Sequence, residues 1–93
     1  MTVPATDSPP GASPRLPVPL SASVTARRYL VVAIDGDDVL AHRLHACGLW
    51  AGALVERLGQ APFGDPLLFR VHGFRLALRA SEAVRVRVVE AVA

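Results

Sequence analysis

The chain has 93 residues with 52% hydrophobic content, and its ten basic residues, all arginine, exceed its eight acidic residues by a formal net charge of +2. A chain of this length buries only about 60% of the surface that its unfolded form exposes, which excludes a large enzyme with a deep interdomain cleft. Nucleic-acid binding requires clustered positive charge, whereas these arginines are spread along the sequence, so we expect no nucleic-acid partner.

Several features indicate a cytoplasmic location. The single cysteine, Cys47, excludes an intramolecular disulfide, and the first residues lack the basic and apolar regions of a signal peptide. The longest apolar run, at residues 29–34, is far shorter than the roughly 20 residues that cross a bilayer. We therefore expect a protein that does not span the membrane.

Proline divides the chain into two parts. Six of the eight prolines lie within residues 1–19, where they favour extended backbone, and this composition predicts a disordered N-terminal tail. Residues 20–93 are then expected to form one folded domain.

The first elements of that domain are a strand and a helix. The sequence YLVVAI at 29–34 is typical of a buried strand, and the DGDD sequence after it is a turn signal. Asp37 or Asp38 can then cap a helix over residues 39–47 that ends at Gly48.

The rest of the domain predicts strands. Three short strands are expected over 53–58, 67–72 and 74–78, and a closing strand over 84–88, where valines alternate with arginines. Phe69, Phe74, Leu76 and Leu78 are expected in the core. A bend or bulge is expected at Gly73, and a single helical turn over 81–83 with Ser81 as its cap. Glycine is expected to serve turns and caps at Gly36, Gly48, Gly52, Gly64 and Gly73. Five short strands without a βαβ repeat predict a small closed barrel of the all-β class.

The order of four short motifs resembles the FeoA family. The resemblance covers about residues 20–90, nearly the whole folded part. The family's GLxxG element, APxGDP loop, GyxlaLR strand and xEA turn resemble GLWAG at 48–52, APFGDP at 61–66, GFRLALR at 73–79 and SEA at 81–83.

The resemblance implies a fold and a function. The fold would be an SH3-like five-stranded β-barrel with a short helical insertion after the first strand. The function would be a cytoplasmic accessory or regulatory role in ferrous iron uptake, through contact with the FeoB membrane transporter. A related domain forms the C-terminal module of DtxR-type repressors, so a detached regulatory module of a metal-dependent repressor system is the alternative. A homo-oligomer is left open.

One helix face carries a potential metal site. Asp38, His42 and His45 lie within about 60° of arc on an ideal helix, and a carboxylate with two imidazoles suits Fe²⁺ or zinc. The competing interpretation is a solvated polar face, which is common on surface helices. Otherwise the sequence contains no nucleophile-and-base arrangement and no phosphate-binding glycine loop, so we expect neither catalysis nor another cofactor.

Partner binding is expected at two places. Leu49 and Trp50 follow the end of the predicted helix, and either could face the core or present an exposed anchor to a partner. Phe63 lies at the tip of the APFGDP loop and is a second candidate for an exposed contact.

Overall fold

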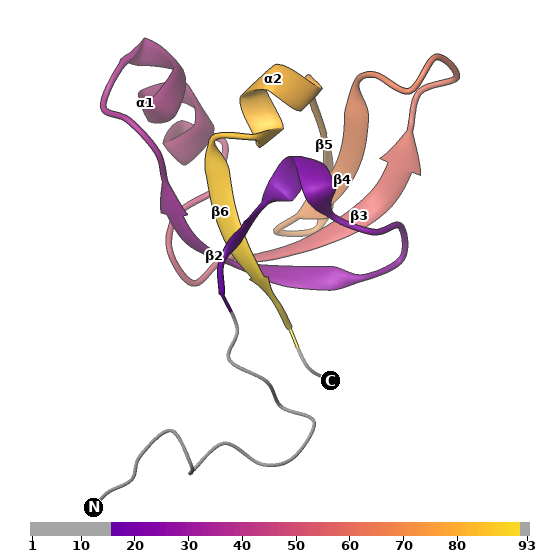
Figure 1. Ribbon diagram of the computed structural model, residues 1–93, viewed down its shortest axis with the longest axis horizontal. Coiled ribbons are helices and arrows are strands. Elements are labelled where there is room, and N and C mark those ends of the chain that lie inside the picture. Colours follow the sequence, from indigo (N-terminus) through magenta and orange to yellow (C-terminus); the bar gives the residue numbers. More distant parts are fainter. Residues whose placement is uncertain (1–15, 92–93) are drawn as a thin grey trace, which may run out of the picture.

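The computed structural model describes residues 16–91, and in this part of the chain six strands form one antiparallel sheet (Figure 1). The order of the strands across the sheet is β1-β6-β2-β3-β4-β5. The strands are β1 (Val18–Pro19), β2 (Arg28–Ile34), β3 (Leu54–Gln60), β4 (Leu67–Val71), β5 (Phe74–Leu78) and β6 (Val86–Glu90). The helical segments are η2 (Leu20–Ala22), α1 (Val39–Ala46) and α2 (Ala80–Ala83). None of them is long and apolar enough to cross a membrane, as far as residues 16–91 are concerned.

The predicted all-β class is confirmed, with a correction of the strand count from five to six. The additional strand is β1, in which Val18 pairs with Val88 and Pro19 with Arg87. A proline is tolerated there because β1 lies at the edge of the sheet. The structured part therefore begins before residue 20, while the predicted tail through residue 15 lies outside the described residues. β1 and β5 are the two edges of the sheet and do not pair, so the strands form no closed ring.

The core lies on the concave side of this sheet. In β4 the inward side chains are buried, whereas Arg70 faces solvent. Phe69 and Leu78 are in the core as predicted, and Leu76 packs against it. Phe74 is 54% exposed, so its predicted core position is wrong. It is the first residue of β5, next to the hairpin turn, and its ring lies near that of His72, with the centroids 6.5 Å apart.

Carboxylates cap both short helices. Asp38 precedes α1 and accepts a hydrogen bond from the Ala41 amide at 3.1 Å, as the sequence predicted for this region. α2 begins one residue earlier than expected, and Ser81 is not its cap. Instead Asp65 accepts from the Ala80 amide at 2.8 Å, and Glu82 accepts from the Arg79 amide at 2.9 Å. The Ala83 and Val84 amides, which a Ser81 cap would have served, instead donate to the Arg79 and Ala80 carbonyls.

A two-residue turn joins β4 to β5. His72 and Gly73 have φ of 51° and 86°, and Val71 pairs with Phe74, which is the arrangement of a type I′ hairpin. The bend or bulge expected at Gly73 is therefore a tight turn. The glycines expected at turns or caps all have positive φ: Gly36, Gly48, Gly52, Gly64 and Gly73.

Among residues 16–91, one arginine is buried. Arg57 on β3 is 5% exposed, and its guanidinium carbon lies 5.8 Å from the centre of the Phe69 ring. Its side chain donates to the Ser23 carbonyl at 2.7 Å, the Ser23 hydroxyl at 3.0 Å, the Gly59 carbonyl at 2.8 Å and the Gln60 side chain at 2.9 Å. Arg57 thus ties the segment after η2 to β3.

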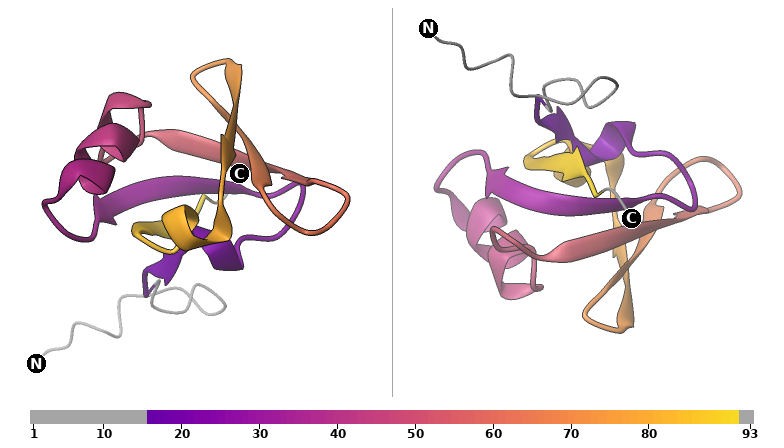
Figure 2. Two further views of the ribbon diagram at one scale, coloured as in Figure 1. Left: turned by 90° about the horizontal axis from the view of Figure 1, so that it is seen from above. Right: turned by 90° about the horizontal axis from the view of Figure 1, so that it is seen from below.

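Figure 2 shows how the elements meet at one end of the sheet. The β4–β5 hairpin crosses the long β2 and β3 strands, and α1 lies beside the end of β2. The loop from α1 to β3 and the turn of the hairpin are in contact, since the His72 ring lies 3.1 Å from the Gly48 carbonyl.

Candidate functional site

Four rings lie next to one another where α1, the loop after it and the β4–β5 hairpin meet. The ring centroids are 6.0 Å apart for His45 and Trp50, 4.8 Å for Trp50 and His72, and 6.5 Å for His72 and Phe74. All four residues are exposed to solvent, and Trp50 has 45% of its surface accessible. We call these four residues the ring cluster.

Glycine at position 48 makes the ring cluster possible. A Cβ atom there would lie 2.6 Å from His72 Cδ2, and Gly48 has φ of 100°, so a larger residue would clash and be strained. The His72 ring instead lies against the glycine, and its Nε2 donates to the Gly48 carbonyl at 3.1 Å. Since a carbonyl only accepts, this bond places a proton on Nε2. The glycine-leucine motif thus positions a ring of the distant hairpin.

The two residues after Gly48 have opposite environments. Leu49 is fully buried in the core, whereas Trp50 faces solvent. The partner contact expected at Leu49 is therefore corrected to a core position, because its side chain packs into the hydrophobic core of the curved sheet. Trp50 is the member of the pair that a partner can reach.

An open cavity of about 480 Å³ adjoins Trp50. It lies between α1 and the end of β2, with His42, His45 and Asp37 on one side and Ile34 and Trp50 among its other lining residues. Such a mixed apolar and polar concavity can accept a side chain of a binding partner.

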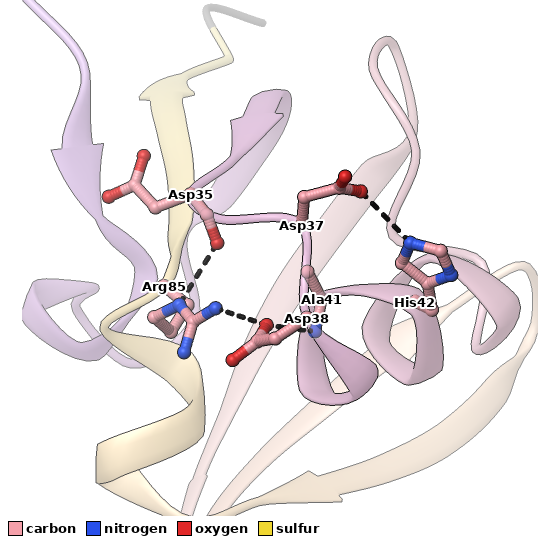
Figure 3. A network of polar contacts seen from close by, with 6 residues as sticks. All are labelled: Asp35, Asp37, Asp38, Ala41, His42 and Arg85. Carbon is pink, nitrogen blue, oxygen red and sulfur yellow. Dashed lines mark hydrogen bonds and ion pairs between the residues drawn. The ribbon is translucent and has the colours of Figure 1, made fainter.

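A polar network joins the start of α1 to the segment before β6 (Figure 3). Arg85 donates to the Asp35 carbonyl at 2.9 Å and to the Asp38 carboxylate at 2.6 Å. The hydrogen bond from Arg85, followed by the one from the Ala41 amide, holds the pKa of Asp38 below its ordinary value. The neighbouring Asp37 carboxylate points the other way and lies 3.0 Å from His42 Nε2.

These contacts correct the predicted metal site of Asp38, His42 and His45. The prediction placed Asp38 on the helix, but Asp38 is the extended residue before it and turns its carboxylate toward the helix amides and Arg85. His42 pairs with Asp37, and His45 lies beside Trp50. Over residues 16–91, no group of three or more histidine, cysteine or acidic side chains is arranged to hold a metal ion.

Phe63 does not belong to the ring cluster. It is 98% exposed on the loop between β3 and β4, which Figure 1 shows at the opposite end of the molecule from α1. Conversely, the sequence reasoning missed two members of the cluster, His72 and Phe74. Gly73 between two apolar runs was the available signal, because glycine readily adopts the positive φ that a two-residue hairpin turn requires.

The coiled antiparallel sheet, with one helix inserted after β2, defines a small SH3-like domain. A model of the FeoA domain matches residues 18–90, and the chain therefore belongs to the FeoA family. No curated protein matches the chain.

Two solved structures of FeoA proteins are similar to this chain. A FeoA-like protein from Clostridium acetobutylicum has 26% identity and a TM-score of 0.76, over 83% of this chain and 90% of that chain. FeoA from Stenotrophomonas maltophilia, solved with zinc, has 35% identity and a TM-score of 0.68, over 76% and 88% of the two chains. That protein is described as a prokaryotic SH3 domain protein and a candidate activating factor of bacterial ferrous iron transport.

A third solved structure has the same fold. ScaR with bound Zn²⁺ has 19% identity and a TM-score of 0.72, over 85% of this chain but 39% of that chain. The likeness at this identity concerns the fold alone.

Proposed function

We propose that this protein is a non-catalytic accessory factor of ferrous iron uptake that acts in the cytoplasm by binding the FeoB transporter through the ring cluster. The observation that carries the proposal is the exposed Trp50, held against His72 at a ring separation of 4.8 Å. Membership of the FeoA family supports the link to ferrous iron transport.

The ring cluster has the properties of a binding anchor. Tryptophan is among the residues that most often dominate the energy of protein interfaces, above all where neighbouring groups fix its position beforehand. His45 and His72 flank the indole on two sides, and the cavity of about 480 Å³ beside it offers space for a partner side chain. Phe63 provides a separate exposed contact that a large partner can reach at the other end of the domain.

Binding to detergent-solubilised FeoB of the same organism tests the proposal. The isolated GTPase domain of that transporter serves as a comparison, because it separates a contact at the membrane from one at the soluble domain. Trp50→Ala should weaken binding at least about thirtyfold, since truncation of an interface anchor costs about 2 kcal/mol or more. Val39→Ala is the matched control, because Val39 is also an exposed apolar residue but lies outside the ring cluster.

Three outcomes are informative. Binding that Trp50→Ala abolishes and Val39→Ala preserves supports both the function and the site. Binding that neither substitution changes supports the function and refutes the ring cluster as its site. A correctly folded chain that binds neither the transporter nor the GTPase domain refutes the proposed function.

A further inference from the structure

The solvent-facing side of the sheet carries a row of charged side chains across four strands. The register pairs Arg28 on β2 with Glu56 on β3, Glu56 with Arg70 on β4, and Arg70 with Arg75 on β5. The row thus contains three arginines and one glutamate. Within residues 16–91, its one ion pair joins Arg70 to Glu56 at 3.7 Å.

Arg70 and Arg75 form an unfavourable pair. They lie directly opposite each other on the exposed side of an antiparallel hairpin, where like charges destabilise the sheet. No carboxylate of the described chain is paired with Arg75 or Arg28. An anionic group from another molecule would relieve this repulsion.

The next row on the same side is apolar. Leu30 on β2 pairs with Leu54 on β3, and both side chains are exposed, with 37% and 46% of their surfaces accessible. Val32, two residues further along β2, is exposed as well. The solvent side of an antiparallel sheet is ordinarily polar, so adjacent exposed aliphatic residues at this position are unusual.

The charged and apolar rows are continuous with the ring cluster. A shallow cavity of about 310 Å³ has Arg28, Leu54 and Arg70 in its lining together with His72, which belongs to the ring cluster. We call this surface the outer face: Arg28, Leu30, Leu54, Glu56, Arg70 and Arg75.

We propose that the outer face binds a segment of a partner protein that carries acidic side chains next to aliphatic ones. Carboxylates of the segment pair with Arg28 and Arg75, and its aliphatic side chains cover Leu30 and Leu54. Arginine suits this role because its planar guanidinium can bind a carboxylate through two parallel hydrogen bonds. The inference rests on the proposed function in one respect, namely that the transporter is the partner in which the segment is sought.

The composition of the outer face favours a polypeptide over an anionic membrane. Surfaces that recognise acidic lipids carry clusters of about four to eight basic residues. The outer face has three arginines with a glutamate among them. The fixed cross-strand positions of these charges instead match a partner with defined spacing.

The first test measures the affinity of the transporter for charge variants of the full chain. Arg28→Gln and Arg75→Gln should together weaken binding by at least about tenfold, and raising NaCl from about 0.05 to 0.5 M should weaken the wild-type complex. Arg79→Gln is the control, because it removes a charge from an exposed arginine beyond the end of β5. If Trp50→Ala weakens binding but the arginine variants and salt do not, the proposed function stands and this inference is wrong.

The second test does not depend on the transporter. A short synthetic peptide of repeated Leu-Leu-Glu-Glu, which presents both residue types on one side when extended, is titrated into the labelled chain, next to its leucine-lysine counterpart, and amide shifts are followed by NMR. Shifts along β2, β3 and β5 with the glutamate peptide alone, lost in the double arginine variant, support the inference even if the transporter does not bind. Equal responses to both peptides, no response to either, or binding only to phosphatidylcholine-phosphatidylserine vesicles would overturn it.

Discussion

Replacing Arg57 by methionine should destabilise the domain by about 3 kcal/mol. The substitution keeps an unbranched side chain in the core but removes every donor that serves the Ser23 carbonyl and hydroxyl, the Gly59 carbonyl and the Gln60 side chain. Ser23 is buried, so its orphaned acceptors cost about 1 to 3 kcal/mol, whereas Gln60 is exposed and can turn to water. The remaining loss comes from the Gly59 bond and from the contact with Phe69.

A loss of this size is measurable in a small domain. Stabilities of about 0.05 to 0.15 kcal/mol per residue give roughly 4 to 11 kcal/mol for the described part of the chain. Urea unfolding can be followed by the emission of Trp50, the single tryptophan, and by circular dichroism. Arg57→Lys should lie between wild type and methionine, because an ammonium group cannot reach the same set of acceptors.

Arg70→Met provides the matched control for this experiment. Arg70 is an exposed arginine on the neighbouring strand with one surface ion pair, so its loss should cost less than about 1 kcal/mol. The reasoning is refuted if Arg57→Met is as stable as Arg70→Met or more stable than wild type. The first result would mean that the cost of removing the guanidinium from water nearly cancels what its hydrogen bonds return, and the second that this cost is the larger of the two.

Three further substitutions test the contact between Gly48 and His72, the hydrogen bond of the Tyr29 hydroxyl, and the dependence of stability on acidic pH. Gly48→Ala should lower the free energy of unfolding by more than about 1 kcal/mol and change the emission of Trp50, because the new Cβ would displace the His72 ring and alanine is strained at a φ of 100°. An unchanged urea midpoint would contradict this. Tyr29→Phe should lower stability by about 1 kcal/mol, because the hydroxyl accepts from a backbone amide at 2.8 Å, and a melting curve identical to wild type would argue against that bond. The pKa of Asp38 is lowered in the folded protein, so its charge stabilises the fold at pH values above the ordinary carboxyl pKa of about 3.9. This contribution is lost as the pH falls through the pKa of the folded state. Asp38→Asn should therefore lower Tm at neutral pH and flatten its decline in acid, while parallel Tm curves for the two proteins would count against the linkage.

Most elements of the fold could be predicted because their signals are local. β2, β4, β5 and α1 lie within a residue of their expected bounds, since alternation, glycine and the aspartates before the helix act over a few residues. The closing strand begins two residues later than predicted. Val84 is the C-terminal cap of α2, and the backbone amide of Arg85 donates to the Glu82 carbonyl in the same turn. The alternation of valine and arginine therefore begins two residues before the strand itself.

The candidate site could be predicted only in part, because it depends on distant contacts. The sequence leaves open whether Trp50 faces the core or solvent, and its environment is set by the bond between Gly48 and His72, 24 residues apart. The burial of Arg57 likewise depends on Ser23, 34 residues away. Helical spacing also grouped Asp38 with the two histidines, although the residue before a helix does not follow the helical rotation.

The position of β2 in the sheet has a consequence for how the chain reaches this structure. β2 pairs with β3 on one side and with β6 on the other, so one of its two edges stays open until the chain has been synthesised through Glu90. Until then Tyr29 and Val31 lack their pairing with Glu90 and Val88, and the open edge can pair with other chains. Because this last pairing joins segments far apart in sequence, it is expected to be the slow step of folding. A ribosome-bound intermediate that lacks β6 would therefore be the form of this protein most dependent on chaperones.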